Sequence, residues 1–214
     1  MLSKIQVEGG NEEEKKKFYT NLYRSYVART TWSDVNGKYV DVNEKIQQVD
    51  PDSPIYGCDA LWNTFWNLNQ LWALVNPDLT SKWVKSFLEI YNTGGWLPKG
   101  PAGIEYSGIM EASHEIALIV AAYQKGIRDF DVENAFKAMV HQQTTPGIKT
   151  PENGYAGNKF FESYMKLGYV PHEEGQVSNT LEYAYDDWCV SQMAKALGKK
   201  KEYELFIKRA GNYK

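Results

Sequence analysis

Glu105 is the first residue of this 214-residue chain whose type and setting favour acid–base chemistry. It lies in a segment stiffened by Pro98 and Pro101, between the apolar groups of Ile104 and Tyr106. A carboxyl held against apolar neighbours has a raised pKa, keeps its proton near neutral pH and can act as a general acid. A solvated loop glutamate would look the same in sequence, so both interpretations stay open.

Asp186 and Asp187 form the second candidate, in a predicted helix that also carries Glu182. Adjacent helical residues point about 100° apart, so the two aspartates cannot share a face, whereas Glu182 and Asp186 do. No Lys or Arg lies within this stretch, which is interleaved with Tyr183, Tyr185 and Trp188. Unpaired carboxylates among aromatic residues predict a polar pocket on the inner face of the helix. A solvated acidic face is the alternative.

His114 is the third candidate and is flanked by Glu111 and Glu115. His114 and Glu111 are three residues apart on a predicted helix, so they could bond to each other or contact one ligand. A lone histidine on a mostly apolar helix is more often a satisfied core residue. The chain has three histidines, so we expect no multi-histidine metal site. Its many carboxylate and amide oxygens suit a hard cation such as Ca²⁺.

A series of helices must position these residues. Hydrophobic periodicity and helix-breaking residues predict helices over 11–29, 59–76, 78–94, 108–125, 131–141, 157–167, 178–197 and 200–210. Asp78 or Thr80 is expected to cap the third of these, and Ser178 the seventh. Residues 30–58, 96–107, 142–155 and 169–177 are expected to be loops, with a short hairpin around Asn36-Gly37. Strand signals are weak, so we expect an all-α protein of antiparallel helix pairs, with its long loops gathered around a pocket.

Composition excludes several classes of protein. The net charge of −3 gives no basis for a nucleic-acid groove or an anionic membrane surface, and no apolar run reaches the roughly 18 residues of a membrane span. Cys58 and Cys189 are too few for a disulfide framework, and Cys189 is expected to be a buried thiol. Seven Trp and fifteen Tyr suit a cleft that stacks on sugar rings, or an aromatic helical core. The first four residues lack the apolar segment of a signal peptide, so we expect either a cytoplasmic protein or a piece of a larger secreted one.

One run resembles a known family. Residues 177–190, Val-Ser-Asn-Thr-Leu-Glu-Tyr-Ala-Tyr-Asp-Asp-Trp-Cys-Val, continuing from Met193 to Gly198, closely resemble the signature of glycoside hydrolase family 92, the calcium-dependent exo-α-mannosidases. The segments Ser3–Gly10, Leu61–Trp66 and Gly94–Pro98, then Ile104-Glu105 and His114, follow the same family in order. The resemblance covers essentially the whole chain, and its Thr180–Trp188 run is the most specific part.

The resemblance implies a fold and a reaction. The fold is an (α/α)6 toroid, usually preceded by a β-sandwich, so residues 1–214 are expected to be a partial catalytic domain without the β-sandwich and the C-terminal half. The reaction is removal of terminal mannose, expected to be α-1,2-linked, with inversion of configuration. An acid and a carboxylate base then stand roughly 6.5–9.5 Å apart. The parent is expected to be secreted or periplasmic, and the isolated chain inactive.

The resemblance also assigns roles to residues. Glu105 matches the acid, and the Asp186/Asp187 pair matches the base region, with the choice between the two left open. Substrate contacts are expected from Trp62, Trp66, Trp96, His114 and Glu182. The family's Ca²⁺ binds the sugar hydroxyls, and Asn179, Glu182 and Gln192 are loose candidates for its ligands.

One departure affects specificity. Many members read Trp-Asp-Thr-Phe-Arg where this chain has Trp62-Asn63-Thr64-Phe65-Trp66, so an Asp and an Arg are lost together. A glycosidase of another sugar or linkage, a non-catalytic aromatic-lined sugar-binding domain and a purely structural helical scaffold are the competing hypotheses. We expect a mannoside glycan as partner and no nucleic acid. An open half-toroid would expose apolar helix faces that favour homo-oligomers.

Overall fold

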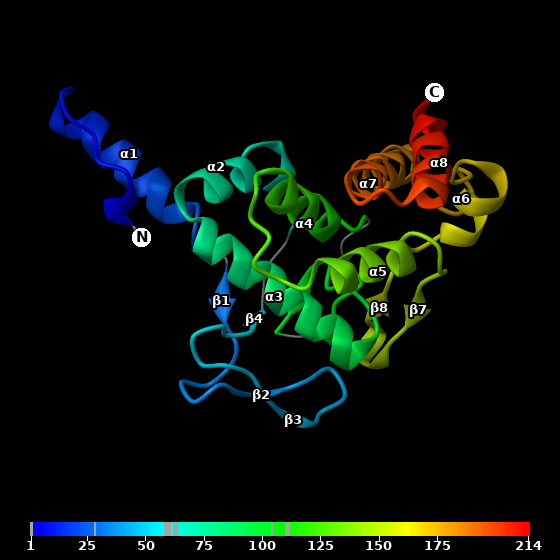
Figure 1. Ribbon diagram of the computed structural model, residues 1–214, viewed down its shortest axis with the longest axis horizontal. Helices are drawn as coiled ribbons and strands as arrows, with labels where there is room; N and C mark the ends of the chain where they lie inside the picture. The colour runs from blue at the N-terminus through cyan, green and yellow to red at the C-terminus, as the bar shows by residue number, and fades with distance from the viewer. Residues whose placement is uncertain (1, 28, 58–60, 62–63, 104, 110–111) are drawn as a thin grey trace.

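The computed structural model describes residues 2–27, 29–57, 61, 64–103, 105–109 and 112–214. Within these ranges the chain is mostly helical (Figure 1), with the helices α1 Glu12–Arg24, α2 Leu68–Val75, α3 Pro77–Gly94, α4 Glu115–Gln124, α5 Val132–Gln142, α6 Phe161–Leu167, α7 Val177–Ala196 and α8 Lys200–Arg209. Short antiparallel pairs join β1 Thr30–Thr31 to β4 Tyr56–Gly57, β2 Lys38–Val40 to β3 Ile46–Gln48, β5 Pro101–Ala102 to β6 Glu105–Tyr106, and β7 Ile148–Lys149 to β8 Tyr155–Ala156. The predicted helical class is confirmed.

Two helix beginnings illustrate the local sequence rules. Asn11 caps α1 as its position before three glutamates indicates, with its side chain accepting a backbone N–H three residues on. The third predicted helix starts earlier than expected, because Asn76 precedes it and Pro77 occupies its first position. Proline fits there since that N–H has no partner inside the helix. The predicted caps Asp78 and Thr80 therefore lie within the helix.

Among the described residues, the predicted helix over 59–76 is α-helical only in α2, Leu68–Val75. Residues 58–60, 62 and 63 lie outside the described residues, and a single 3₁₀ turn, Thr64–Trp66, precedes α2. Trp66 is 67% exposed, whereas Trp72 in α2 is buried. The guanidinium of Arg29 stands 4.5 Å from the ring centre of Trp72 and 4.2 Å from that of Trp83, which fixes the chain leaving α1 against α2 and α3.

The segment 30–58 is more ordered than a loop, because it contains two antiparallel strand pairs. The β2–β3 hairpin turns at residues 41–45 and not at Asn36-Gly37, which precedes it. The carboxylate of Asp41 shapes this turn by accepting two backbone N–H groups within it and the Gln47 side-chain amide. Gly37 has a φ of +82°, and a Cβ there would lie 2.1 Å from the Val49 carbonyl oxygen, so only glycine fits.

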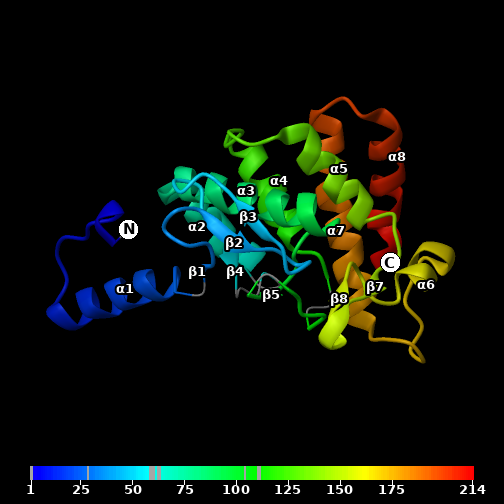
Figure 2. The ribbon, with the colours of Figure 1, turned by 90° about the horizontal axis from the view of Figure 1, so that it is seen from below.

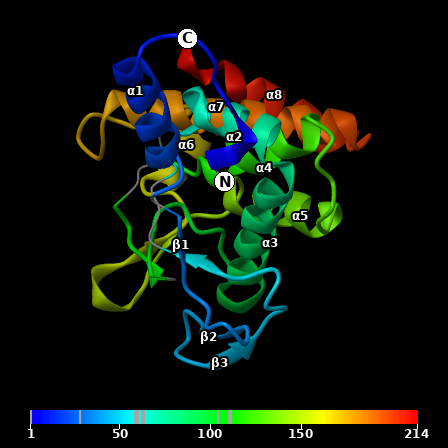
Figure 3. The ribbon, with the colours of Figure 1, turned by 90° about the vertical axis from the view of Figure 1, so that its left-hand side faces the viewer.

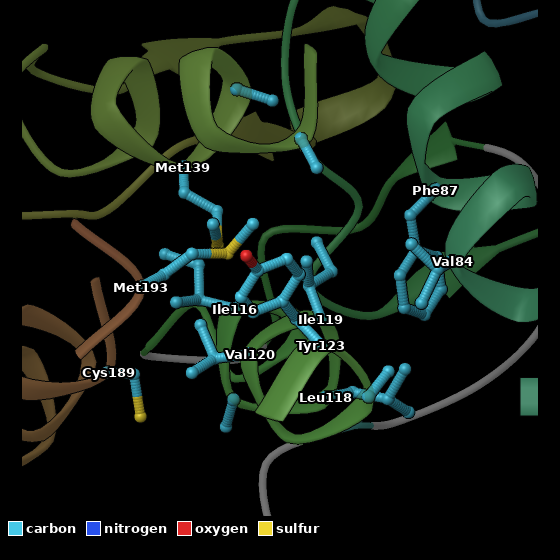
Figure 4. Packing of buried hydrophobic residues seen from close by; sticks show 14 of the residues in the cluster. Val84, Phe87, Ile116, Leu118, Ile119, Val120, Tyr123, Met139, Cys189 and Met193 are labelled. Carbon is cyan, nitrogen blue, oxygen red and sulfur yellow. The ribbon is translucent and has the colours of Figure 1, made fainter. Parts of the chain in front are cut away.

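Helix α4 is the centre of the main core. Most of its residues are buried, and it packs against α2, α3 and α7, which agrees with its almost continuous apolar sequence. Met139 of α5 and Met193 of α7 meet over Ile116 and Val120 of α4 (Figure 4). Cys189 is buried in the same cluster, as predicted, and burial raises the pKa of its thiol.

The α7–α8 pair and the β2–β3 hairpin lie at opposite ends of the molecule (Figures 1 and 3). Helices α7 and α8 are antiparallel and are joined by residues 197–199. Helix α1 extends away from the rest of the molecule (Figures 1 and 2). None of the described helices is both long and apolar enough to cross a bilayer.

Candidate functional site

Glu105 lines a cleft of about 620 Å³. The cleft is bounded by the β2–β3 turn, the β5–β6 pair that carries Glu105, and the segment around Lys149. Trp32 and Trp96 contribute aromatic surface to the lining, and Asp41 contributes a carboxylate. Trp32 is 42% exposed, so part of its side chain is accessible to a ligand. The cleft therefore joins an acid, aromatic surface and polar groups from segments far apart in sequence.

The backbone around Glu105 is held firmly. The Tyr106 hydroxyl donates to the Trp96 carbonyl oxygen at 2.8 Å and accepts from the Trp96 N–H at 3.2 Å. The Ser107 hydroxyl donates to the carbonyl oxygen of Gly100. The described residues of the segment 96–107 are non-helical, as its prolines and glycines predict, but they include the β5–β6 strand pair in place of a wholly irregular loop.

The side chain of Glu105 is exposed, which corrects the expectation of a carboxyl held against apolar groups. Successive residues of a strand point to opposite faces. In β6 the inward position belongs to Tyr106, which is 8% exposed, and Glu105 takes the outward one. The same alternation that removes Glu105 from the apolar interior places its carboxyl in the cleft.

Asp186 lies in the interior, outside the cleft lining. It is fully buried, and both of its carboxylate oxygens have partners. One accepts the backbone N–H of Ser113 at 2.8 Å, and the other lies 2.9 Å from Nδ1 of His114. Asp186 therefore ties α7 to the segment that leads into α4.

His114 bridges two carboxylates of α7. Its Nε2 lies 3.6 Å from Glu182, one turn before Asp186, so these two residues share a helix face as predicted. Burial alone would lower the pKa of His114, but Asp186 and Glu182 outweigh it and raise the pKa to about 10. The imidazole is then a cation at neutral pH, buried against the rings of Phe65 and Tyr185. Glu111 lies outside the described residues.

Asp187 faces a different neighbour, as helix geometry requires. It is fully buried and forms a bidentate pair with Arg209 of α8, at 2.6 and 2.9 Å, and accepts the Tyr164 hydroxyl at 2.8 Å. Burial raises the pKa of Asp187, and this effect outweighs that of Arg209, which lowers the pKa by stabilising the carboxylate. The acidic stretch is thus neither an unpaired pocket nor a solvated face, because its partners His114 and Arg209 come from other segments and not from the stretch itself.

The three residues named for Ca²⁺ do not converge. Asn179 caps α7 together with Gln176, whose N–H donates to the Asn179 side chain at 2.7 Å, so the cap is Gln176 and not Ser178. Ten residues separate Glu182 from Gln192, which is about 15 Å along a helix and too far for ligands of one ion. In the part of the chain that the structure describes, no group of three or more His, Cys, Asp and Glu residues is placed to hold a metal.

Only some of the predicted substrate contacts lie in the cleft. Trp96 lines the cleft with Glu105, packed 4.5 Å from the His141 ring. Trp66 is exposed. Trp66, the buried His114 and Glu182 all lie outside that lining. Trp62 lies outside the described residues.

Sequence reasoning named Glu115 only as a neighbour of His114, and it missed the buried amides of Gln142 and Asn158. Glu115 is fully buried, and its carboxyl has no hydrogen-bond partner among the described residues. Burial and the nearby Asp186 raise its pKa to about 8, while Lys99, which is also buried, lowers it. A glutamate followed by a long apolar helical run was the available signal. Gln142 and Asn158 gave no signal, because a buried amide looks like a surface amide in sequence.

Comparison with known proteins places this arrangement in a family. The model of the glycosyl hydrolase family 92 catalytic domain matches residues 1–214. The family GH92 inverting mannosidase BT2199 of Bacteroides thetaiotaomicron is similar in structure, with 32% identity, a TM-score of 0.86 and 99% of this chain covered. The α-mannosidase BT3965 of the same organism, in complex with mannoimidazole, gives 27% identity and a TM-score of 0.87 over 99% of this chain.

A curated relative agrees with the structural neighbours. It is an uncharacterized secreted glycosidase of Arthroderma benhamiae, 29% identical over 156 residues, which are 68% of this chain and 19% of the relative. The chain spans 29% of BT2199 and 27% of BT3965, less than a third of each of these relatives. With the family model matched from the first residue to the last, the chain belongs to glycosyl hydrolase family 92.

Proposed function

We propose that the protein containing this chain hydrolyses terminal α-linked mannose from glycans, with inversion of configuration and with Glu105 as the general acid. The observation that carries the proposal is the place of Glu105, an exposed carboxyl on a firmly held strand in the wall of the aromatic cleft. A carboxylic acid there can reach the glycosidic oxygen of a bound sugar and protonate it. Family membership supports the reaction class, and the mannosidases of similar structure support the sugar.

Asp186 and Asp187 are the candidates for the catalytic base. A catalytic base must reach a water molecule on the far side of the sugar ring. Asp186 and Asp187 both have their oxygens engaged inside the protein, so either could act only after its contacts rearrange. We propose that in this state they act as positioning residues, with Asp186 orienting the segment before α4 and Asp187 joining α7 to α8.

The (α/α)6 toroid, the α-1,2 linkage and the Ca²⁺ requirement are carried by the family resemblance. No group of three or more His, Cys, Asp and Glu residues is placed to hold a metal within the described ranges, and no step of the proposed reaction depends on the ion. A secreted parent is proposed by analogy with the secreted relative. Exposed apolar side chains on the outer faces of α7 and α8, such as Leu181 and Leu205, are available for association with further protein surface.

The test is hydrolysis by the whole protein that carries this sequence. Hydrolysis of mannobioses with different α-linkages and of aryl α-mannosides is compared with that of the matching glucosides and galactosides, with and without a chelator. The anomer first released is identified by NMR. Release of β-mannose supports the proposal. Preference for another sugar would contradict the substrate, and release of the α-anomer would contradict inversion.

A non-catalytic sugar-binding domain is the competing function, since the aromatic cleft serves both. Glu105→Gln separates the two hypotheses. In an enzyme it abolishes turnover and leaves sugar affinity nearly intact. In a binding domain the wild-type protein shows affinity without turnover.

A further inference from the structure

A hydrogen-bonded network lies buried beneath the cleft. Ser113, Gln142, Asn158 and Asp186 are all fully buried, and they come from four separate segments. The amide of Gln142 donates to the Ser113 hydroxyl at 2.9 Å, and that hydroxyl donates to the Asn158 side-chain oxygen at 2.8 Å. The Ser113 backbone N–H donates to Asp186 at 2.8 Å. The network therefore links α5 and α7 to the segment before α4.

Gln142 extends this network to the strand of the acid. Its side-chain oxygen accepts the backbone N–H of Leu97 at 3.3 Å. Both backbone polar groups of the preceding Trp96 bond to the Tyr106 hydroxyl. Tyr106 is the neighbour of Glu105 in β6. Every step from Gln142 to the acid is thus a hydrogen bond or a peptide bond between residues that the structure describes.

We propose that Gln142 is a positioning residue. It holds the strand that carries Glu105 so that the carboxyl of Glu105 lies within reach of the leaving oxygen that it protonates. The inference rests on the proposed glycosidase activity. Proton transfer needs the acid within about 2.6–3.2 Å of its acceptor, and a displacement of about 1 Å can cost roughly 100-fold in rate. Gln142 lies outside the cleft lining, so it acts through Leu97 and Tyr106 and not on the sugar.

The chain offers a matched control in the next residue. Gln143 is the same residue type and is equally buried, but its side-chain amide has no hydrogen-bond partner in the described ranges, and it too lies outside the cleft lining. Methionine has nearly the volume and length of glutamine and no amide. Gln142→Met removes the bonds to Leu97 and Ser113, whereas Gln143→Met removes none.

The experiment compares two substrates in each variant of the whole protein. The leaving group of a dinitrophenyl α-mannoside is a strongly acidic phenol, which departs without protonation. The leaving groups of methyl α-mannoside and of a mannobiose need a proton from the acid. We expect Gln142→Met to lower kcat on the poor leaving group by about 10- to 100-fold and on the dinitrophenyl substrate by less than about threefold, with KM nearly constant. Gln143→Met should leave the ratio of the two rates at the wild-type value.

The ratio separates positioning from general damage, because a partly unfolded sample loses both rates equally. Gln142→Glu keeps an oxygen that can accept the Leu97 N–H, so it should recover most of the ratio. Gln142→Leu, which also lacks the amide, carries the test if Gln142→Met does not fold. Equal loss on both substrates, or the same change in Gln143→Met, overturns the inference alone. A wild-type protein that turns over no mannoside overturns the proposed function as well.

Discussion

The cleft around Glu105 and the carboxylates of α7 use the same chemical group in opposite ways. Glu105 is exposed on a short strand between loops. Asp186 and Asp187 are fully buried on a long helix, with each oxygen engaged. An exposed carboxyl can exchange a proton with a ligand, whereas a buried, paired one holds helices together. The contrast predicts that changes in the cleft alter kinetics and changes on α7 alter stability.

The largest effect is expected from Glu105→Gln. Loss of a general acid lowers kcat on an unactivated α-mannoside by about 10²–10⁴-fold. The side chain is exposed, so the melting temperature should stay within about 2 °C of wild type. Steady-state kinetics and differential scanning fluorimetry of the whole protein measure both. Normal turnover by the Glu105→Gln variant would show that Glu105 is not the general acid, and the proposed difference between the cleft and α7 would then be wrong.

Arg209→Met is expected to act on stability. It leaves Asp187 buried without its cation, which typically costs about 3–5 kcal/mol of unfolding free energy. Urea unfolding followed by tryptophan fluorescence measures the loss. The double variant Asp187→Asn with Arg209→Met removes both charges and should regain most of it. If the single variant loses less than about 1 kcal/mol, the pair does not hold α7 to α8.

Glu115→Gln should change the pH dependence of stability. The pKa of Glu115 is raised to about 8, from an ordinary value of 4.5. Between these values the folded state keeps a proton that the unfolded state has released, so stability falls as pH rises through this window. Glutamine does not titrate, and we expect a gain of about 1–3 kcal/mol at pH 8 with little change at pH 4. A gain that is equal at both pH values would contradict the assignment.

The smallest effect is expected from Trp32→Leu on the cleft wall. Loss of an aromatic surface that stacks on a sugar costs about 0.5–1.5 kcal/mol. The expected result is a rise in KM of about 3- to 10-fold with kcat nearly constant. Trp66→Leu serves as the control, because Trp66 is exposed outside the cleft. If the control shifts KM as strongly as Trp32→Leu, the sugar does not bind where the cleft predicts.

Most of the helices and the divergence of the two aspartates follow from local sequence alone. Apolar periodicity located most helices, and helical geometry alone required Asp186 and Asp187 to face different partners. The run around Asp186 also pointed to the family. These features depend on residues close in sequence, whose relative positions the local backbone fixes.

Which carboxylates are available for chemistry depends on contacts between distant segments. Arg209 reaches Asp187 and Ser113 reaches Asp186 across long separations in sequence, which no local pattern reports. The hairpin turn at residues 41–45 and the cleft it bounds with Glu105 arise in the same way. Burial and pairing set the protonation and access of a carboxyl, and both depend on which distant segments the fold brings together.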